Sequence, residues 1–294
     1  MNRNNRNGRG RLLPSLKPAG SMATALALCA ACLWAVGLGF QARAQSDDFN
    51  DGNDTSPVAW TRYNPIGVGS WSFPDGNTYR IQAAASPDPG NYGPGRAASF
   101  VPVTYTDFYV AADIVNWDDS LHQISGVTAR IGSIGAGTTS GYLFTHDRGD
   151  PSSSTSGDMD IVRIDGENAT SLTTYGSDSI HFEPGSSYRL VFIGVGSHFI
   201  GQVFKLPDLD VPVVEITADE STYASGYSGL IVVDNSDPTY DGTGDVTFDN
   251  YVATAGAPYL FDNFNDGNDT LPLPAWSRYN PIGTGSYSFP GGNT

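Results

Sequence analysis

The sequence predicts an all-β fold, built from two antiparallel sheets as a sandwich or a barrel, on three observations. After residue 44, no segment of ten or more residues shows the periodicity of an amphipathic helix. The chain contains 35 glycines and 19 prolines, which separate short runs of β-branched and aromatic residues. Roughly a dozen such runs fall within about 210 residues, a spacing typical of sandwiches and long enough for a core without disulfides.

The first 44 residues have the pattern of a signal peptide. A cationic start is followed by an apolar run over residues 22–40 and by Ala42-Arg43-Ala44, a small-x-small cleavage pattern. The apolar run is nearly long enough to be a membrane anchor, but its Ala and Gly content and its ending favour cleavage. Cys29 and Cys32 both lie in this run, so the mature chain has no thiol chemistry and no disulfide. We therefore expect a secreted protein, extracellular, on a bacterial surface or in a periplasm.

Removal of residues 1–44 leaves nine Lys and Arg residues against 31 Asp and Glu residues, a net charge of −22. A surface this acidic repels nucleic acid and anionic membranes, so neither is an expected partner. It suits solubility outside the cell and offers oxygen ligands to cations, although a solvated acidic surface explains most of these carboxylates.

The expected strands can be taken in chain order. Residues 70–73 and 78–83 flank Pro74-Asp75-Gly76-Asn77, a hairpin signal, and residues 86–95 form a loop. In residues 107–115 the apolar residues alternate, so that Phe108, Val110, Ala112 and Ile114 share one face of a half-buried strand. The remaining expected strands are residues 127–131, 142–146, 159–164, 188–194, 198–205, 213–217, 229–233 and 245–253, of which 188–194 and 198–205 form a hairpin.

One long segment of the sequence occurs twice. Residues 47–55 return as residues 262–270, an offset of 215, and residues 60–78 return as residues 276–294, an offset of 216. A repeat of this length is a whole domain. The sequence therefore predicts a signal peptide over 1–44, a sandwich domain over 45–256 and the start of a second copy over 257–294, where a partial reading frame stops. We also expect the 257–294 tail to be capable of strand exchange with residues 47–78.

The order of several short motifs carries a family resemblance. These motifs are Asp-Asp-Phe at 47–49, Gly-Ser-Trp at 69–71, Gly-Asn-Thr-Tyr at 76–79, Tyr-Arg-Leu-Val-Phe at 188–192 with Gly-Gln-Val at 201–203, Gly-Tyr-Ser-Gly-Leu-Ile-Val at 226–232 and Val-Thr-Phe-Asp-Asn-Tyr at 246–251. In this order they resemble the laminin-G-like, concanavalin A-like jelly rolls of secreted bacterial proteins. The resemblance implies two curved sheets, with the first and last strands of the domain side by side.

Catalysis finds little support in the sequence. Jelly-roll glucanases place Glu-x-Asp-x-x-Glu on one strand, and a retaining mechanism needs two carboxyl groups about 5–5.5 Å apart. Asp158 and Asp160 share a strand face, but neither catalytic position holds a glutamate and Arg163 stands where a third acid is needed. The nucleophile elbow, a mature cysteine and paired histidines are all missing. We therefore assign no catalytic residue.

A structural calcium ion is the expected cofactor. The Asp48-Phe49-Asn50-Asp51-Gly52 segment is one residue short of an EF-hand-type loop. If the first and last strands are neighbours, Asp48 or Asp51 would approach Asp249, and backbone carbonyls would complete the shell. The competing explanation is that Asp51 and its neighbours are turn residues.

A sugar-binding face follows from the fold resemblance and the supply of aromatic residues, a weak warrant when taken alone. Trp117 lies in a polar turn after a strand, whereas we interpret Trp60 and Trp71 as core residues. The expected carbohydrate-binding residues, on or beside the concave face, are Trp117, Arg130, Tyr142, His146 and Arg163. Packing or a surface ion pair is an equally good explanation for each.

Three functional hypotheses remain open at this stage. The first is a non-catalytic module that binds polysaccharide or another extracellular ligand. The second is a glycoside hydrolase or lyase, which predicts two carboxyl groups on the concave face and a raised pKa for at least one of them. The third is a structural adhesion repeat, which predicts a concave face that is filled or covered.

Overall fold

The computed structural model describes residues 44–152, 157–176, 180–236 and 242–256, which belong to a compact unit starting at Ala42. The predicted signal peptide, apart from Ala44, and the predicted second copy at 257–294 lie outside the described residues, so both stay predictions. No helix in the described part is long and apolar enough to cross a membrane.

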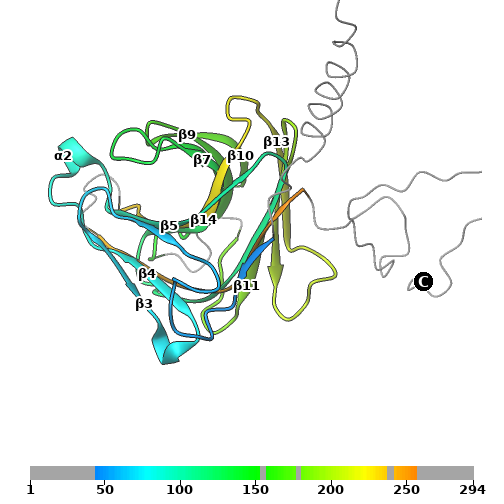
Figure 1. Cartoon of the computed structure of the whole chain (residues 1–294). Coiled ribbons are helices and arrows are strands. Elements are labelled where there is room, and N and C mark those ends of the chain that lie inside the picture. The colour runs from blue at the N-terminus through cyan, green and yellow to red at the C-terminus, as the bar shows by residue number, and fades with distance from the viewer. Residues whose placement is uncertain (1–43, 153–156, 177–179, 237–241, 257–294) are drawn as a thin grey trace, which may run out of the picture. The chain divides into compact units, whose positions relative to one another are not determined.

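The described residues form two antiparallel sheets stacked as a sandwich, which confirms the predicted fold class (Figure 1). One sheet has the order β13-β12-β11-β6-β15-β4-β3, and β1 also pairs with β15. Its strands are β1 (Gln45–Asp47), β3 (Gly69–Ser72), β4 (Tyr79–Ala83), β6 (Phe108–Trp117), β11 (Tyr188–Val195), β12 (His198–Lys205), β13 (Val214–Asp219) and β15 (Gly244–Ala255). We call this the eight-stranded sheet.

The second sheet has seven strands in the order β10-β9-β8-β7-β14-β5-β2. Its strands are β2 (Thr61–Tyr63), β5 (Arg96–Tyr105), β7 (Gln123–Gly132), β8 (Ser140–Asp147), β9 (Asp158–Asp165), β10 (Asn168–Tyr175) and β14 (Gly226–Asp234). Two short helical turns, η1 (Pro74–Gly76) and α2 (Pro89–Tyr92), lie in the connections. The expected hairpins β3–β4 and β11–β12 both form.

The first and last strands lie side by side, as the family resemblance implied. Gln45 faces Ala253 and Asp47 faces Tyr251 in the antiparallel β1–β15 register. Tyr251 is buried, and the ring of Trp60 meets it edge-on at 4.5 Å between centroids. The core position predicted for Trp60 is therefore correct, and this residue fastens the opening segment to the closing strand.

Alternation decides which residues fill the space between the sheets. Phe108, Val110, Ala112 and Ile114 on β6 are all buried in the main core, as the sequence pattern predicted. The seven-stranded sheet contributes Tyr142 and Phe144 from β8 to the same core. The ring of Tyr142 lies 4.5 Å from that of Phe199 on the opposite sheet, so these residues link the two layers.

Three strands had no clear sequence signal. β5 contains three small residues and Pro102, which lies where the β5–β14 register shifts and so removes no ladder hydrogen bond at that point. β10 is an edge strand whose residues are exposed or half-buried, so it carries no apolar alternation. β2 has only three residues. All three are strands because their neighbours hold them.

Candidate functional site

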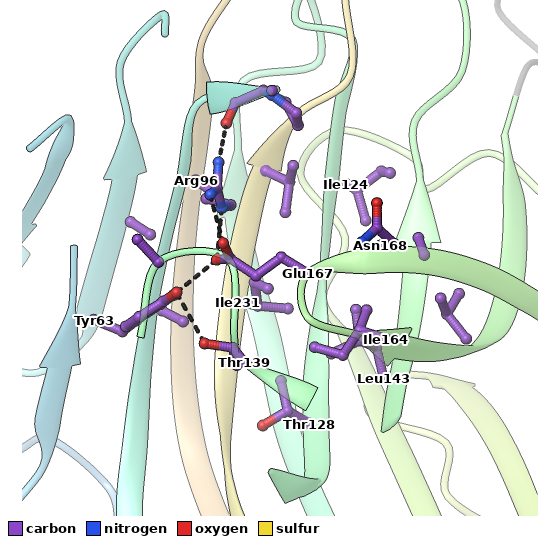
Figure 2. A pocket seen from close by; sticks show the side chains of 18 of the residues that line it. Tyr63, Arg96, Ile124, Thr128, Thr139, Leu143, Ile164, Glu167, Asn168 and Ile231 are labelled. Atoms are coloured by element: carbon purple, nitrogen blue, oxygen red, sulfur yellow. Dashed lines mark hydrogen bonds and ion pairs between the residues drawn. The ribbon is translucent and has the colours of Figure 1, made fainter. Parts of the chain in front are cut away.

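The outer face of the seven-stranded sheet holds a cavity of about 740 Å³, which we call the outer cavity (Figure 2). Its size is in the range of about 300–1,000 Å³ typical of small-molecule sites. The floor is made of alternate residues on adjacent strands, all facing away from the main core. They are Ala98 and Phe100 on β5, Ile231 and Val233 on β14, Ile124 and Thr128 on β7, Leu143 and Thr145 on β8, and Val162 and Ile164 on β9.

This floor is apolar although it is the outside of a sheet. Phe100, Leu143 and Ile164 are at most 8% exposed and form a cluster separate from the main core. An outward-facing sheet surface is ordinarily polar, so apolar residues on both sides of central strands mark this face as an interaction surface. On β8, residues 141–146 are all buried, and the sequence therefore shows no alternation there.

A network around Glu167 closes one end of the outer cavity. Arg96 donates two hydrogen bonds to the carboxylate, from Nε at 3.0 Å and from a terminal nitrogen at 2.9 Å. The Tyr63 hydroxyl donates a third at 2.5 Å and accepts one from Thr139 at 2.9 Å (Figure 2). The backbone N–H of Gly137 donates a fourth to Glu167. The network thus ties together β2, β5 and the turns before β8 and β10.

The electrostatics of Glu167 suit a structural role. Burial acts to raise its pKa, but the hydrogen bonds from Arg96 and Tyr63 outweigh burial and hold the pKa below the usual range. Burial together with the Glu167 bond raises the pKa of Tyr63. Glu167 adopts a left-handed backbone conformation, with φ of +68°, in the β9–β10 turn. An ionised carboxylate with every oxygen occupied fixes the end of the cavity and is not free to transfer a proton.

Neutral polar groups surround the remainder of the outer cavity. Asn91, Asn168 and Asn235 contribute side-chain amides, and Thr139 and Thr145 contribute hydroxyls. Tyr92, at the end of α2, is 53% exposed and offers a ring face at the edge. Among the described lining residues only Arg96 and Glu167 carry charge, and they neutralise each other.

Three carboxylates lie on the same sheet face, beyond the Asn235 edge of the outer cavity. Asp147 on β8 directly faces Asp158 on β9, and Asp160 follows two residues later on the same side of β9. Burial raises the pKa of Asp147, and the charge of Asp160 adds to this effect. Asn235 donates to Asp147 at 2.6 Å, and His122 lies 3.5 Å from its other oxygen. Like charges that face each other across two strands destabilise a sheet. These three carboxylates are therefore the residues of this face that best fit an acid–base role.

The expected placement of Tyr142 and His146 on the concave face is wrong. Both point between the sheets, because the residues that face outward from β8 are Leu143 and Thr145. Tyr142 is fully buried and its hydroxyl accepts a hydrogen bond from the backbone N–H of Tyr223 at 2.9 Å. The imidazole of His146 stacks on Phe182 at 3.8 Å and 1°. Because residues 141–146 of β8 are all buried, the sequence has no polar alternation that distinguishes the inward face of this strand from the outward one.

Arg130 and Arg163 also lie away from the outer cavity. Arg130 has a φ of +51° where the β7–β8 register shifts, and its buried guanidinium donates to the carbonyls of Thr106, Tyr223 and Gly196. Arg163 points from β9 toward the eight-stranded sheet and pairs with Glu220 at 2.8 Å. The register shift in β7 turns Arg130 away from the outer face. Arg163 alternates with Val162 and Ile164 along β9 and therefore faces inward.

Trp117 is the last residue of β6, in the eight-stranded sheet, and packs partly buried against the main core. Its ring meets Phe182 and Tyr188 edge-on at 6.0 and 6.2 Å. The five predicted sugar-binding residues are therefore not gathered in one place, and none lines the outer cavity. The alternation along β9 could have identified Val162 and Ile164 as residues of the outer face. Met159 and Ile161 fill the main core, so the residues of opposite parity face outward.

Burial of His146 makes the stability of the fold depend on pH. Burial lowers the pKa of His146 to about 3, from 6.5 in the unfolded chain. Below pH 6.5 the unfolded state therefore binds a proton that the native state does not, and native stability falls as the pH falls toward 3. Between pH 6.5 and pH 4 we expect this group to cost roughly 3 kcal/mol of unfolding free energy.

Urea unfolding of the parent and of His146→Phe at several pH values tests this expectation. The phenyl ring preserves the stacking on Phe182 without a titrating group, so the variant should lose less stability on acidification. His198→Phe, at a side chain that is 48% exposed, is the control and should follow the parent. Parallel pH profiles for the parent and His146→Phe would contradict the assignment.

The calcium candidates Asp48, Asp51 and Asp249 are only partly brought together. Asp48 follows β1, and burial raises the pKa of Asp249 with added contributions from the charges of Asp113 and Asp48. Asp51 accepts a hydrogen bond from the backbone N–H of Asn53, and Asp48 accepts one from the backbone N–H of Asn50, both at 3.2 Å, which is the turn role that competed with ligation. In the described residues, no group of three or more His, Cys, Asp or Glu side chains converges as metal ligands do.

Calcium therefore stays a prediction that needs backbone oxygens beside Asp48 and Asp249. A cation there would relieve the repulsion among Asp48, Asp113 and Asp249, so chelation is expected to lower the melting temperature of the protein. Thermal unfolding in EDTA and in added CaCl₂ measures this, with MgCl₂ as the control. Superimposable melting curves would remove the calcium proposal.

Comparisons with known proteins concern the fold. No family model matches the sequence, and no curated protein matches it significantly. The carbohydrate-binding module CBM66 from Bacillus subtilis matches 67% of this chain and 96% of its own, at 18% identity and a TM-score of 0.47. Lectin II from Ulex europaeus matches 74% and 100%, at 8% identity and 0.48. The xylan β-1,4-xylosidase from Bacillus halodurans C-125 matches 73% of this chain and 40% of its own, at 12% identity and 0.46.

Proposed function

We propose that the domain is a secreted, non-catalytic, laminin-G-like module that binds a neutral glycan in the outer cavity. The observation that carries this proposal is the cavity itself, which combines an apolar floor, the exposed ring of Tyr92 and a border of amides and hydroxyls. The C–H faces of a sugar ring match the floor and the tyrosine, and its hydroxyl groups match the border. An adhesion repeat has no need of such an open, aromatic-edged hollow.

The charges favour a neutral glycan over a uronic acid. Arg96 is occupied by Glu167 and by the backbone carbonyls of Tyr92 and Pro94, so no cation in the described lining is left for a ligand carboxylate. Asp147, Asp158 and Asp160 lie on the same face, and residues 45–294 carry a net charge of −22. Both features repel a polyanion.

A glycan screen with the mature chain tests this proposal. Xylan, glucans, galactans and fructans represent neutral glycans, and alginate and polygalacturonate represent acidic ones. We expect retention on at least one neutral glycan. Failure to bind any neutral glycan, or binding to acidic glycans alone, would overturn the proposal.

Tyr92 provides the residue-level prediction for this site. Tyr92→Ala removes the exposed ring and should weaken glycan binding about tenfold, equivalent to about 1.4 kcal/mol, with no change in melting temperature. Tyr175→Ala is the matched control, since Tyr175 is 38% exposed and lies on β10 outside the cavity lining. Affinity electrophoresis or calorimetry measures both. Equal affinity for the two variants would place the ligand elsewhere.

The second candidate function is glycoside cleavage at the Asp147–Asp158 pair. The facing carboxylates and the raised pKa of Asp147 are what a retaining or inverting glycosidase would need. Against this, Asp147 is held by Asn235 and by the backbone N–H of Gly149. Reducing-end assays on the bound glycan distinguish the two functions, since turnover that disappears in Asp147→Asn would establish the enzyme.

A further inference from the structure

The strands within residues 45–74 lie at the margins of the two sheets, although the segment also places Phe49, Val58 and Trp60 in the main core. β2 is the edge strand of the seven-stranded sheet, β3 is the edge strand of the eight-stranded sheet, and β1 pairs with β15 alone. We call residues 45–74 the opening segment. Because none of its three strands lies between two others, the segment can leave without separating any remaining pair of strands.

Side-chain hydrogen bonds fix the shape of the opening segment, and one of them joins the segment to Tyr79 in the rest of the domain. Asp47 is 2% exposed and accepts hydrogen bonds from Trp60 Nε1 at 2.8 Å and from the backbone N–H of Phe49 at 2.9 Å. Asp54 accepts from Arg62 at 2.6 Å and from the hydroxyl of Tyr79 at 2.9 Å.

Rings from the same segment complete the attachment. Phe49 and Phe73 stack on Tyr79 at 4.9 and 5.1 Å, and Trp60 meets Tyr251 at 4.5 Å. Tyr63 reaches Glu167 at the end of the outer cavity. Tyr79, Tyr251 and Glu167 belong to the rest of the domain, so these contacts define the surface on which the segment sits.

Every one of the side chains that shape or attach the opening segment occurs again near the end of the chain. The counterparts of Asp47, Phe49, Asp54, Trp60, Arg62, Tyr63 and Phe73 are Asp262, Phe264, Asp269, Trp276, Arg278, Tyr279 and Phe289. The changes in between include Asp48, which corresponds to Asn263, and half-buried Trp71, which corresponds to Tyr287. Buried Val58 lies where the copy has one inserted residue, within Leu271-Pro272-Leu273-Pro274-Ala275. Residues 260–290 therefore carry the same attachment chemistry.

The β1–β15 register fixes how long a connection the copy would need to reach the same surface. Gln45 starts β1 opposite Ala253, and β15 ends at Ala255. The counterpart of Gln45 is Leu260, so residues 256–259 remain to connect β15 to a new antiparallel strand. Four residues are an ordinary length for a β-hairpin connection.

We propose that residues 260–290 can replace the opening segment on their own chain. The copy would pair with β15 as β1 does, Trp276 would meet Tyr251, and Tyr279 would take the place of Tyr63 beside Glu167. The sandwich would then be closed from its other end, with the outer cavity rebuilt and residues 45–74 released. The inference rests on the repeat and the described contacts and is independent of glycan binding.

Paired tryptophan substitutions in the full chain test the replacement. Trp276→Ala alone should leave the melting temperature unchanged, because the opening segment is intact. Trp60→Ala alone should lower it by about 5 °C, because the copy can take over. The double variant should lose at least about 10 °C, more than the sum of the single changes. If Trp276→Ala has no further effect in the Trp60→Ala background, the proposal is wrong.

Disulfide trapping identifies the occupant directly, with Cys29 and Cys32 replaced by alanine. Ser46 faces Val252 across β1 and β15, and Phe261 is the counterpart of Ser46. Ser46→Cys with Val252→Cys should trap the opening segment, and Phe261→Cys with Val252→Cys should trap the copy, both as monomers. Leu260→Cys with Val252→Cys is the control and should not crosslink, because adjacent strand residues face opposite sides. Crosslinked dimers in place of monomers would assign the contact to a second chain and overturn the intramolecular proposal.

Discussion

Replacing Glu167 with alanine is expected to lower the unfolding free energy by about 3 kcal/mol, because the substitution leaves a buried cation and a buried hydroxyl without their shared partner. The side chains of Arg96 and Glu167 are each only 13% exposed. The Tyr63 hydroxyl would keep its bond from Thr139 but would lose its acceptor. Urea unfolding at neutral pH measures the loss.

Two further variants give the Glu167 experiment its controls. Glu167→Gln keeps an acceptor for Tyr63 but not the charge, and it should lie between the parent and Glu167→Ala. Lys205→Ala removes an exposed ion pair with Glu183 and should produce no measurable change. Because the pKa of Glu167 is lowered in the native state, its contribution is present above the unfolded pKa of 4.5 and is lost as the pH falls below it. A Glu167→Ala protein as stable as Lys205→Ala would refute this account.

Gly229→Ala is the second substitution with a large expected effect. Gly229 lies on β14, between β5 and β7, and a Cβ atom there would be 2.0 Å from the carbonyl oxygen of Ser99 and 2.9 Å from the Cα of Phe100. These are backbone atoms of the neighbouring strand, so relief requires two central strands to separate. We expect a loss of roughly 3 kcal/mol or more in unfolding free energy, at or above the upper end for overpacking.

Gly132→Ala is the matched control for Gly229→Ala. Gly132 ends β7 in the same sheet, and a Cβ atom there would meet nothing within 4 Å. The control should therefore stay within about 0.5 kcal/mol of the parent. If both alanine variants unfold at the same urea concentration, the close approach of β14 and β5 has been misjudged.

The sequence predicted the parts of the fold that local patterns control. Alternation on β6 identified its buried face, and the turn around Gly196 predicted the β11–β12 hairpin. The family resemblance implied the neighbouring positions of β1 and β15, which the register confirms. By contrast, β10 shows no pattern because polar residues fill an exposed edge, and β5 contains Ala97, Ala98 and Pro102, residue types that are depleted in strands.

The candidate site was much harder to predict because it depends on the phase of each strand. Leu143 and Tyr142 are adjacent and both buried, one under the outer cavity and one in the main core. The bulge at Arg130 shifts the phase again within β7. The Arg96–Glu167–Tyr63 network joins residues up to 104 positions apart, and no local pattern could assemble it.

The β1–β15 pairing also determines how the domain would respond to tension. Gln45 lies opposite Ala253, so the two ends of the domain leave the sandwich from the same end of one antiparallel pair. A force that drew these ends apart would act along the inter-strand hydrogen bonds and open them one after another, as a zipper opens, instead of shearing them all together. The short β1 would therefore separate from β15 at low force. A polypeptide that contains this domain would extend at that force before the remaining strands of the sandwich separated.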